Sequence, residues 1–283
     1  MFILTIYISF NLFYNLIYNL YLSKLSNEKI INHIIESTKN EKKSPLLSKY
    51  QKPENILKTE FTFFENNNNN TINVDNTTSK NNLVYIYSTH ETESYSDKYL
   101  EVYNINPTVK TMSYILKDYL YDLGINVLVE ENSVTEILKK NNWSYKYSYD
   151  ASKELVQKKI NETPTLKLII DLHRDSAPLS KTLMTYKEIP YAKILFVVGA
   201  EHENYEQNYN LAQTLNDYLN EEIPGITRGI SKKSGPGVNG IYNQNLSSNS
   251  VLIELGGQYN EIEELNNSLK ILSKVILKYL EGE

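Results

Sequence analysis

LIIDLHRDS, residues Leu168–Ser176, is the stretch around which the rest of the sequence can be ordered. The apolar run over 166–172 predicts a buried strand, and polar side chains crowd the point where that strand ends. Those side chains are Asp171, His173, Arg174 and Asp175. Ligands of open α/β sheets bind outside the carboxyl ends of the strands, so the stretch predicts a functional site at such an edge.

Two other stretches have the same form. LVYIYSTHETE (Leu83–Glu93) carries His90 and Glu93 just past its apolar run, and SVLIELGG (Ser250–Gly257) carries Glu254 near its end. Because parallel strands bring their carboxyl ends to one edge, we expect these side chains to converge with His173. Two His and two Glu can supply three zinc ligands and one general base.

The preferences of zinc suggest which of these four side chains are ligands and which is the base. Zinc in hydrolases is held by two neutral imidazoles and a carboxylate, with one position left for a water whose pKa falls to about 7. His90 and Glu93 are three residues apart and can face one ion, and with His173 they complete the set, which leaves Glu254 as the base.

Alternatives to this assignment exist in the same sequence. Glu254 could pair with an arginine, and His173 could be a buried, hydrogen-bonded core histidine. His202 in EHENYE also follows a predicted strand and is a rival ligand, although the start of a solvated helix explains it as well. His33 lies in a low-complexity segment and is expected to have no role.

Composition narrows the classes of function. With 283 residues and 41% apolar residues, the chain can bury a core. It has no cysteine, so any metal must be held by His, Asp or Glu. A net charge of -5 and scattered lysines argue against nucleic acid as a partner.

Arginine is rare in this chain. Arg174 and Arg228 are its only two arginines, against 27 lysines, and both occur in polar stretches around the predicted site. A guanidinium binds a carboxylate through two parallel hydrogen bonds, which an ammonium cannot do. We therefore expect both arginines to bind carboxylates of the substrate.

The amino-terminal part divides into two predicted segments. Residues 1–23 are uncharged and about long enough for a membrane-spanning helix, which needs roughly 20 apolar residues. A cleaved signal peptide is the alternative, but the segment lacks a basic start and a small-residue cleavage site. Residues 24–82 are rich in Asn, Lys, Ser and Thr and predict a low-complexity tether.

From residue 83 to 283, strand and helix patterns alternate. This order predicts a three-layer α/β domain with a central, mostly parallel sheet flanked by helices. Strands are expected at 83–88, 125–129, 166–172, 194–198 and 251–255, and helices at 109–123, 150–160, 203–222 and 262–280. Residues 131–149 are expected to form a Tyr-rich loop, and the stretch that begins at Gly225 to form turns.

Several of these motifs, taken in order, resemble a known family. STHETESY, LIIDLHRDS, the VVG turn at Val197–Gly199, PGITRGI, IYNQNL and VLIELGG resemble stage II sporulation protein P, a membrane-anchored cell-wall amidase family of spore-forming bacteria. The resemblance runs from about residue 83 to 280. It implies a zinc-dependent N-acetylmuramoyl-L-alanine amidase that acts on peptidoglycan, with activity on stem-peptide crosslinks in some members.

The resemblance also implies roles for single residues. His90, Glu93 and His173 match the zinc ligands, and Glu254 matches the catalytic glutamate. Asn243 and Gln244 of IYNQNL are predicted to bind substrate with Arg174 and Arg228, and Asp171 or Asp175 to orient His173. The remaining expectations are a single-pass protein of the cell membrane with an extracytoplasmic catalytic domain, and partners among sporulation membrane proteins such as a lytic transglycosylase.

Two other functions fit the same residues. One is a different zinc amide hydrolase, such as a carboxypeptidase. The other is a non-catalytic wall-binding module on a membrane tether, in which the four site residues are structural. Metal content and the products of a peptidoglycan digest distinguish these alternatives.

Overall fold

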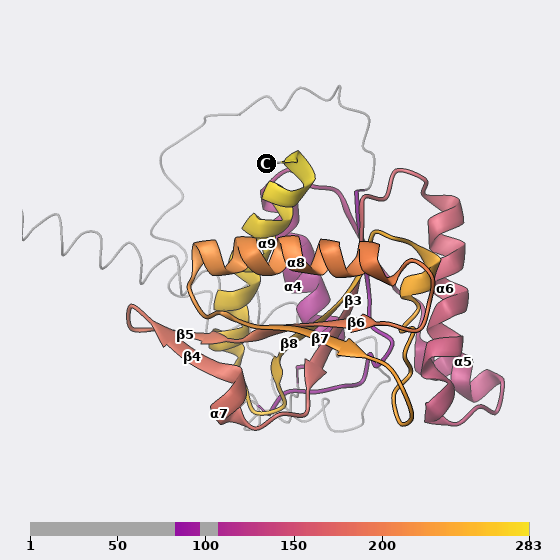
Figure 1. The fold of residues 1–283 in the computed structure, drawn as a ribbon. Coiled ribbons are helices and arrows are strands. Elements are labelled where there is room, and N and C mark those ends of the chain that lie inside the picture. The colour runs from indigo at the N-terminus through magenta and orange to yellow at the C-terminus, as the bar shows by residue number, and fades with distance from the viewer. Residues whose placement is uncertain (1–82, 97–106, 283) are drawn as a thin grey trace, which may run out of the picture.

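The computed structural model describes residues 83–96 and 107–282 (Figure 1). Its main strands are β1 (Val84–Tyr87), β2 (Val127–Val129), β3 (Leu168–Asp175), β6 (Ile194–Gly199), β7 (Thr227–Lys233) and β8 (Ser250–Gly257). They form a six-stranded sheet in the order β2-β1-β3-β8-β6-β7. The predicted α/β fold with a mostly parallel central sheet is confirmed.

Strand direction changes once across this sheet. β2, β1, β3 and β8 run parallel, whereas β6 pairs antiparallel with β8 and parallel with β7. The carboxyl ends of β1, β3 and β8 therefore share one edge with the amino end of β7. The carboxyl end of β6, with the VVG turn, lies toward the opposite edge.

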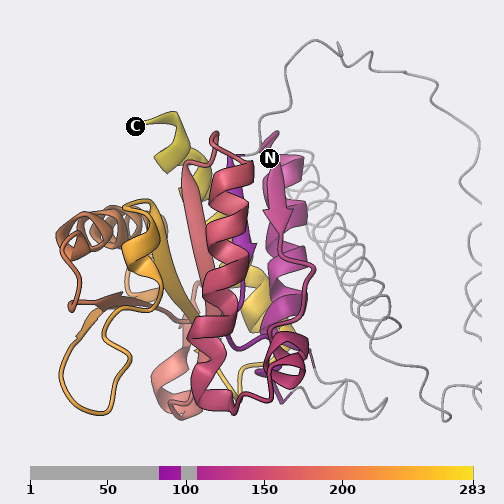
Figure 2. The same cartoon turned by 90° about the vertical axis from the view of Figure 1, so that its right-hand side faces the viewer.

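Helices flank the sheet on both faces (Figures 1 and 2). The helices are α4 (Val109–Asp122), α5 (Val134–Lys140), α6 (Ser148–Glu162), α7 (Leu179–Thr182), α8 (Tyr205–Glu222) and α9 (Ile262–Glu281), with 3-10 turns η3 (Tyr145–Tyr147) and η4 (Gln244–Leu246). Val84 and Ile86 pack into the core formed with α4, α8 and α9, while Tyr85 and Tyr87 pack with Val156 of α6. Alternate residues of a strand point to opposite faces, so α6 covers the face opposite the other three helices.

This alternation also places the polar residues of β3. Ile169 packs with Tyr85, Tyr87 and Val156 on the α6 face. Asp171 and His173 follow at two-residue spacing and therefore point to that same face, while Leu172 joins the larger core. The sheet thus presents its predicted site residues toward the beginning of α6.

The prediction of a loop over 131–149 is wrong, because α5 and η3 lie within it. Ser133 caps α5, its hydroxyl accepting a hydrogen bond from Glu136 N at 3.1 Å. Val134 and Leu138, one turn apart, are buried against Ala151 of α6. Two apolar positions in a seven-residue helix give too little periodicity to detect in the sequence.

The prediction of turns after Gly225 is wrong over residues 227–233, which form β7. The segment TRGISKK has only one aliphatic side chain and lies at the sheet edge, where it pairs with β6 alone. Its order comes from backbone pairing rather than from an apolar pattern, so no alternation of apolar residues indicates a strand there.

Two further differences concern strands. β3 continues to Asp175, so His173 and Arg174 lie within the strand rather than past it. A separate antiparallel hairpin, β4 (Leu183–Tyr186) and β5 (Ile189–Ala192), was not predicted. The hairpin is fixed to α9, where Ser268 Oγ donates to Ala192 O at 2.7 Å.

The predicted membrane anchor at residues 1–23 and tether at 24–82 lie outside the described residues. Within 83–96 and 107–282, no helix combines the length and apolar character that crossing a bilayer requires. Anchor and tether remain predictions.

Candidate active site

The structure brings the three predicted zinc ligands together. His90 and Glu93 lie on the loop that follows β1, and His173 lies in β3, the strand paired with β1. The His90 and His173 rings meet edge to face, with 5.2 Å between their centroids. Glu93 Oε2 is 3.6 Å from His173 Nδ1. Parallel pairing of two strands has thus placed two imidazoles and a carboxylate side by side.

Hydrogen bonds fix the loop that carries His90 and Glu93. Thr89 N and Oγ1 donate to the two carboxylate oxygens of Asp171 at 2.9 and 2.7 Å. Glu93 N donates to His90 O at 2.9 Å and closes a turn, and Glu93 Oε2 accepts from Arg174 N at 3.1 Å. The loop is therefore tied to β3 at both of its ends.

Of the two aspartates predicted to orient His173, Asp171 is the one beside it. Asp171 Oδ1 lies 2.9 Å from His173 Nε2, and Asp171 is 2% exposed. The ring nitrogen nevertheless lacks a well-aligned hydrogen bond, since Nε2 is buried without a partner in the described part of the chain. Asp171 contributes mainly charge to His173 while its oxygens accept from Thr89.

Charges in the site set different protonation states for the two histidines. Burial lowers the pKa of His90, and the neighbouring His173 lowers it further. Burial alone would also lower the pKa of His173, but the Asp171 and Glu93 carboxylates more than offset it, so this pKa is raised well above the usual value. Burial opposes ionisation of Glu93, yet its contacts with His173 and Arg174 N give a net lowered pKa. Without a metal, these shifts favour the neutral form of His90 and the protonated form of His173.

Glu254 lies on β8 directly opposite His173 in the register of the parallel pair. Its Oε2 is buried without a hydrogen-bond partner in the described residues. Burial raises the pKa of this carboxyl to about 7; His173 opposes that shift, and the Glu93 carboxylate adds to it. The alternative that Glu254 pairs with an arginine finds no support in these contacts.

The donor set fits a zinc ion. His90 Nδ1 and Glu254 Oε2 are buried in one site without partners among the described residues, and His173 Nδ1 faces the Glu93 carboxylate at 3.6 Å. Such atoms are costly to bury unless something compensates them, and imidazole nitrogens with a carboxylate are ligands that zinc prefers. Within the described ranges no three His, Asp or Glu side chains already stand in ligating geometry, so these side chains would have to turn toward a common point.

A wall of tyrosines beside the histidines was not predicted. Tyr145 stacks on His90 with 4.7 Å between ring centroids, and Tyr149 stacks on His173 at 6.4 Å. Tyr242 packs edge-on against Tyr149 at 5.4 Å, while Tyr145 itself is 59% exposed. The sequence does carry a pattern, since aromatic residues alternate through WSYKYSY at 143–149. These tyrosines therefore line one side of the site, where the Tyr145 ring is exposed to solvent.

The two arginines have partners inside the chain. Arg228 Nη2 lies 2.6 Å from Asp175 Oδ2, with both side chains about one-fifth exposed. Arg174 Nη1 donates to Asp175 O at 3.4 Å, while Arg174 Nε is buried without a partner in the described residues. Asp175 thus pairs with Arg228 rather than orienting His173. A substrate carboxylate would have to compete with Asp175 for Arg228.

We expect the Arg228 and Asp175 pair to be a measurable stabilising interaction. In a double-mutant cycle of Arg228→Gln and Asp175→Asn, denaturant unfolding should give a coupling free energy of about 1 kcal/mol, because the pair is close and mostly shielded from water. The exposed Lys158 and Glu162 pair, 3.8 Å apart, is the matched control and should give about 0.3–0.5 kcal/mol. A coupling no larger than this control would leave Arg228 available for substrate.

Asn243 and Gln244 lie in the interior, where their amides bind this chain. Asn243 Nδ2 donates to Tyr149 O at 2.9 Å and to Ser152 Oγ at 3.0 Å. Gln244 Nε2 donates to Val197 O at 2.8 Å, and its Oε1 accepts from Gly199 N at 3.0 Å. These contacts give both amides a structural role, and their predicted contact with substrate remains a prediction.

The other two histidines are not part of this cluster. His202 follows β6, whose carboxyl end lies toward the opposite edge of the sheet, and it has no ring contact with His90 or His173 among those of the described chain. Its role as a rival ligand is therefore not favoured. His33 lies outside the described residues.

Comparison with known proteins gives one family. The family model for stage II sporulation protein P matches residues 15–277 of this chain. Stage II sporulation protein P of Bacillus subtilis (strain 168) is 34% identical over 206 residues, which are 70% of this chain and 51% of that protein. The match thus spans about half the length of that relative.

Similarity to solved structures is more remote. The CwlD amidase of Clostridioides difficile, solved in complex with the GerS lipoprotein, has a TM-score of 0.46 at 15% identity and covers 71% of this chain and 100% of its own. A metallo-carboxypeptidase from Burkholderia cenocepacia has a TM-score of 0.41 at 11% identity, over 75% of this chain and 60% of its own. Similarity this remote does not assign a function to the chain.

Proposed function

Because the chain belongs to the stage II sporulation protein P family, we propose that it is a zinc-dependent peptidoglycan hydrolase of sporulation. The bond cleaved is the amide between N-acetylmuramic acid and the L-alanine of the stem peptide. One observation carries the proposal. His90, Glu93 and His173 lie side by side, and Glu254 faces them from the next strand with a buried oxygen that has no partner in the described part of the chain.

In this proposal His90, Glu93 and His173 hold the zinc. Zinc, when bound there, supplies Lewis-acid chemistry: it polarises the amide carbonyl and lowers the pKa of water. Neutral His90 and ionised Glu93 are ready to act as ligands, whereas His173 must first release its proton.

Glu254 is proposed as the general base and acid. Its Oε2 is free to take a proton from the attacking water and to return it to the leaving amine of L-alanine. A general base works best when its pKa lies near the working pH, and burial raises that of Glu254 to about 7. A bound dication would lower this pKa again, because it favours the carboxylate.

Residues outside the reacting centre are proposed to bind the rest of the substrate. Arg174 is part-buried next to the site and is proposed to bind a stem-peptide carboxylate, since its Nε has no partner within the described ranges. Residues 1–23 would anchor the protein in the cell membrane, with the catalytic domain outside the cytoplasm. Other sporulation membrane proteins, such as a lytic transglycosylase, are proposed partners.

Digestion of purified peptidoglycan tests the proposed reaction. The full chain loaded with zinc should release intact stem peptides with a free L-alanine amino terminus, and a chelator should reduce the rate at least about a hundredfold, because the metal supplies several kcal/mol of transition-state stabilisation. Products are identified by mass spectrometry, and zinc added back after chelation is the control for reversible inhibition.

Other products would support the other candidates. Release of single terminal residues from stem peptides would identify a carboxypeptidase. If the chain bound peptidoglycan but released no product, with or without zinc, it would be a wall-binding module. This result would contradict the amidase proposal.

A further inference from the structure

The loop over 88–93 bears two of the three proposed ligands and is held from two sides. On its inner side, Thr89 donates two hydrogen bonds to Asp171 of β3. Further contacts come from Val109 N, which donates to Glu93 O at 3.0 Å, and from the side chain of Glu91, which lies between His90 and Glu93 in the chain. Glu91 contacts α4 and the start of α5 rather than the histidines.

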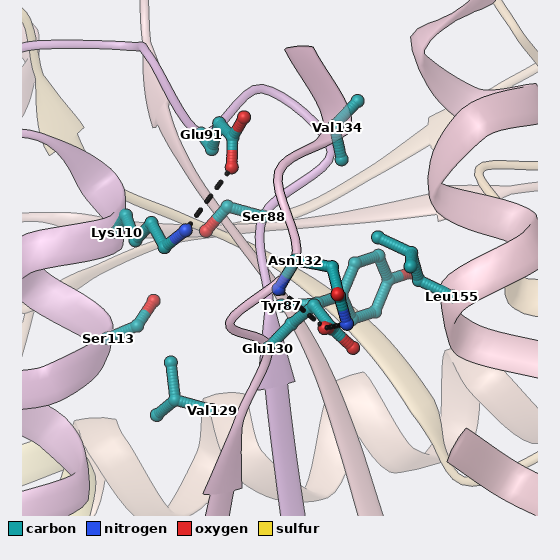
Figure 3. A pocket seen from close by; sticks show the side chains of 10 residues that line it. All are labelled: Tyr87, Ser88, Glu91, Lys110, Ser113, Val129, Glu130, Asn132, Val134 and Leu155. Carbon is teal, nitrogen blue, oxygen red and sulfur yellow. Dashed lines mark hydrogen bonds and ion pairs between the residues drawn. The ribbon is translucent and has the colours of Figure 1, made fainter. Parts of the chain in front are cut away.

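Glu91 contacts three residues of two other segments, and Figure 3 shows one of these contacts, with Lys110. Its Oε1 accepts from Ser133 Oγ and from Thr135 N, the latter at 3.0 Å. Its Oε2 lies 3.5 Å from Lys110 Nζ, and the Glu91 side chain is only 9% exposed. One carboxylate therefore joins the ligand loop to two separate segments of the chain.

Glu91 and Lys110 line a hollow whose described lining includes neither His90 nor His173. Ser88, Glu91, Lys110, Glu130 and Asn132 are among the residues that line it. Figure 3 shows the Glu91 carboxylate directed toward Lys110, apart from the contacts between Glu130 and Asn132. The hollow is thus lined by two acidic side chains, the buried Glu130 and the mostly buried Glu91, of which only Glu91 belongs to the ligand loop.

We propose that Glu91 is a positioning residue for the metal site, an inference that rests on the proposed function. It holds the loop so that His90 and Glu93 face His173 before a metal arrives. A carboxylate that accepts from two neutral donors and faces an ammonium group makes charge-assisted contacts, which are stronger than neutral ones. Without them the loop would keep its ties to β3, the hydrogen bond from Val109 N to Glu93 O, and the contact between the Thr89 and Ser152 hydroxyls.

Loop order matters for metal affinity because binding must collect ligands from separate segments. Ligands that are already in place lose less conformational freedom when the metal binds. Groups outside the first ligand shell commonly change metal affinity by about 10- to 100-fold when they are removed. Glu91 acts through the backbone of the loop, so we expect an effect at the lower end of this range.

The test compares Glu91→Ala with Glu130→Ala in the full chain. Glu130 is a matched control, since it lines the same hollow, is 8% exposed, and accepts from Tyr85 OH and Asn132 Nδ2, both at 2.6 Å. Glu91→Ala should weaken zinc binding about tenfold in a competition assay, whereas Glu130→Ala should change it less than about twofold. Without metal, backbone amides of residues 88–93 should exchange hydrogen faster in Glu91→Ala alone.

Two results would overturn the proposal. One is wild-type hydrogen exchange in the 88–93 loop of Glu91→Ala; the other is an equal loss of zinc affinity in both variants, which indicates general destabilisation. If Glu91→Ala does not fold, Glu91→Gln replaces it, because the amide oxygen still accepts from Ser133 and Thr135. If the wild-type chain binds no zinc, the proposed function fails, and exchange in the metal-free protein still decides whether Glu91 orders the loop.

Discussion

His173→Ala is expected to abolish stoichiometric zinc binding and with it peptidoglycan cleavage. His173 stands at the centre of the cluster, in contact with the His90 ring and 3.6 Å from Glu93. Its loss removes one of two imidazoles, and a zinc site with one imidazole and one carboxylate is incomplete. We expect the wild-type chain to carry about one zinc and the variant to carry almost none, as measured by metal analysis after dialysis.

His202→Ala provides the control for this prediction. His202 is also partly buried, but it follows β6 and lies outside the cluster, so its replacement should leave zinc content unchanged. Full zinc occupancy in the double variant His90→Ala, His173→Ala would reject the proposed ligand set.

The pKa of His173 adds a pH dependence to zinc binding. This pKa is raised well above the usual value, mainly by Asp171 and Glu93 acting against burial, so the metal-free protein keeps a proton on His173 at neutral pH. A metal must displace that proton, and zinc affinity should therefore rise as pH rises toward this pKa. Proton release on zinc binding, measured by calorimetry in buffers of different ionisation enthalpy, should be positive at pH 7.

Much of the central sheet could be predicted from the sequence because its strands are buried. The apolar runs of β1, β3 and β8 are bounded by polar residues, so both their existence and the convergence of His90, His173 and Glu254 followed from strand periodicity. The positions of these three residues relative to one another depend only on the pairing of neighbouring parallel strands.

Features that depend on distant pairing could not be predicted in this way. Arg228 meets Asp175 only because β6 and β7 run against the other strands, and no local pattern shows that reversal. Asn243 and Gln244 bind backbone groups of segments more than 40 residues away. A sequence shows only the residue type of a polar side chain. It therefore does not distinguish a side chain that binds the protein's own backbone from one that binds substrate.

Glu254→Gln is expected to lower the rate of peptidoglycan cleavage by about 10² to 10⁴, the usual contribution of a general base. Glutamine keeps the size and shape of the side chain and leaves His90, Glu93 and His173 to hold the zinc. The amide has no oxygen that can take the proton of the attacking water at neutral pH. Zinc content should therefore remain near that of the wild-type chain.

The stability of the Glu254→Gln variant distinguishes a catalytic role of Glu254 from a structural one. The pKa of Glu254 in the folded, metal-free protein is about 7, above the ordinary value of 4.5, so folding opposes its ionisation. The contribution of Glu254 to the stability of the wild-type chain should fall as pH rises through 4.5 to 7, because its carboxyl then binds fewer protons in the unfolded chain than in the folded one. Glutamine does not ionise, so metal-free Glu254→Gln should melt at a higher temperature than wild type at pH 8 and at a similar temperature at pH 4.

A structural ion pair predicts the opposite result. Had Glu254 compensated a buried cation, its neutralisation would strand that cation and cost several kcal/mol of stability at pH 8. Oε2 has no hydrogen-bond partner among the described residues, and the nearby His173 is already compensated by Asp171 and Glu93, so we expect no such loss. Three measurements on one variant decide between the roles: turnover of peptidoglycan, bound zinc, and the thermal midpoint at the two pH values. A Glu254→Gln chain that is zinc-loaded and as active as wild type would exclude Glu254 as the catalytic base.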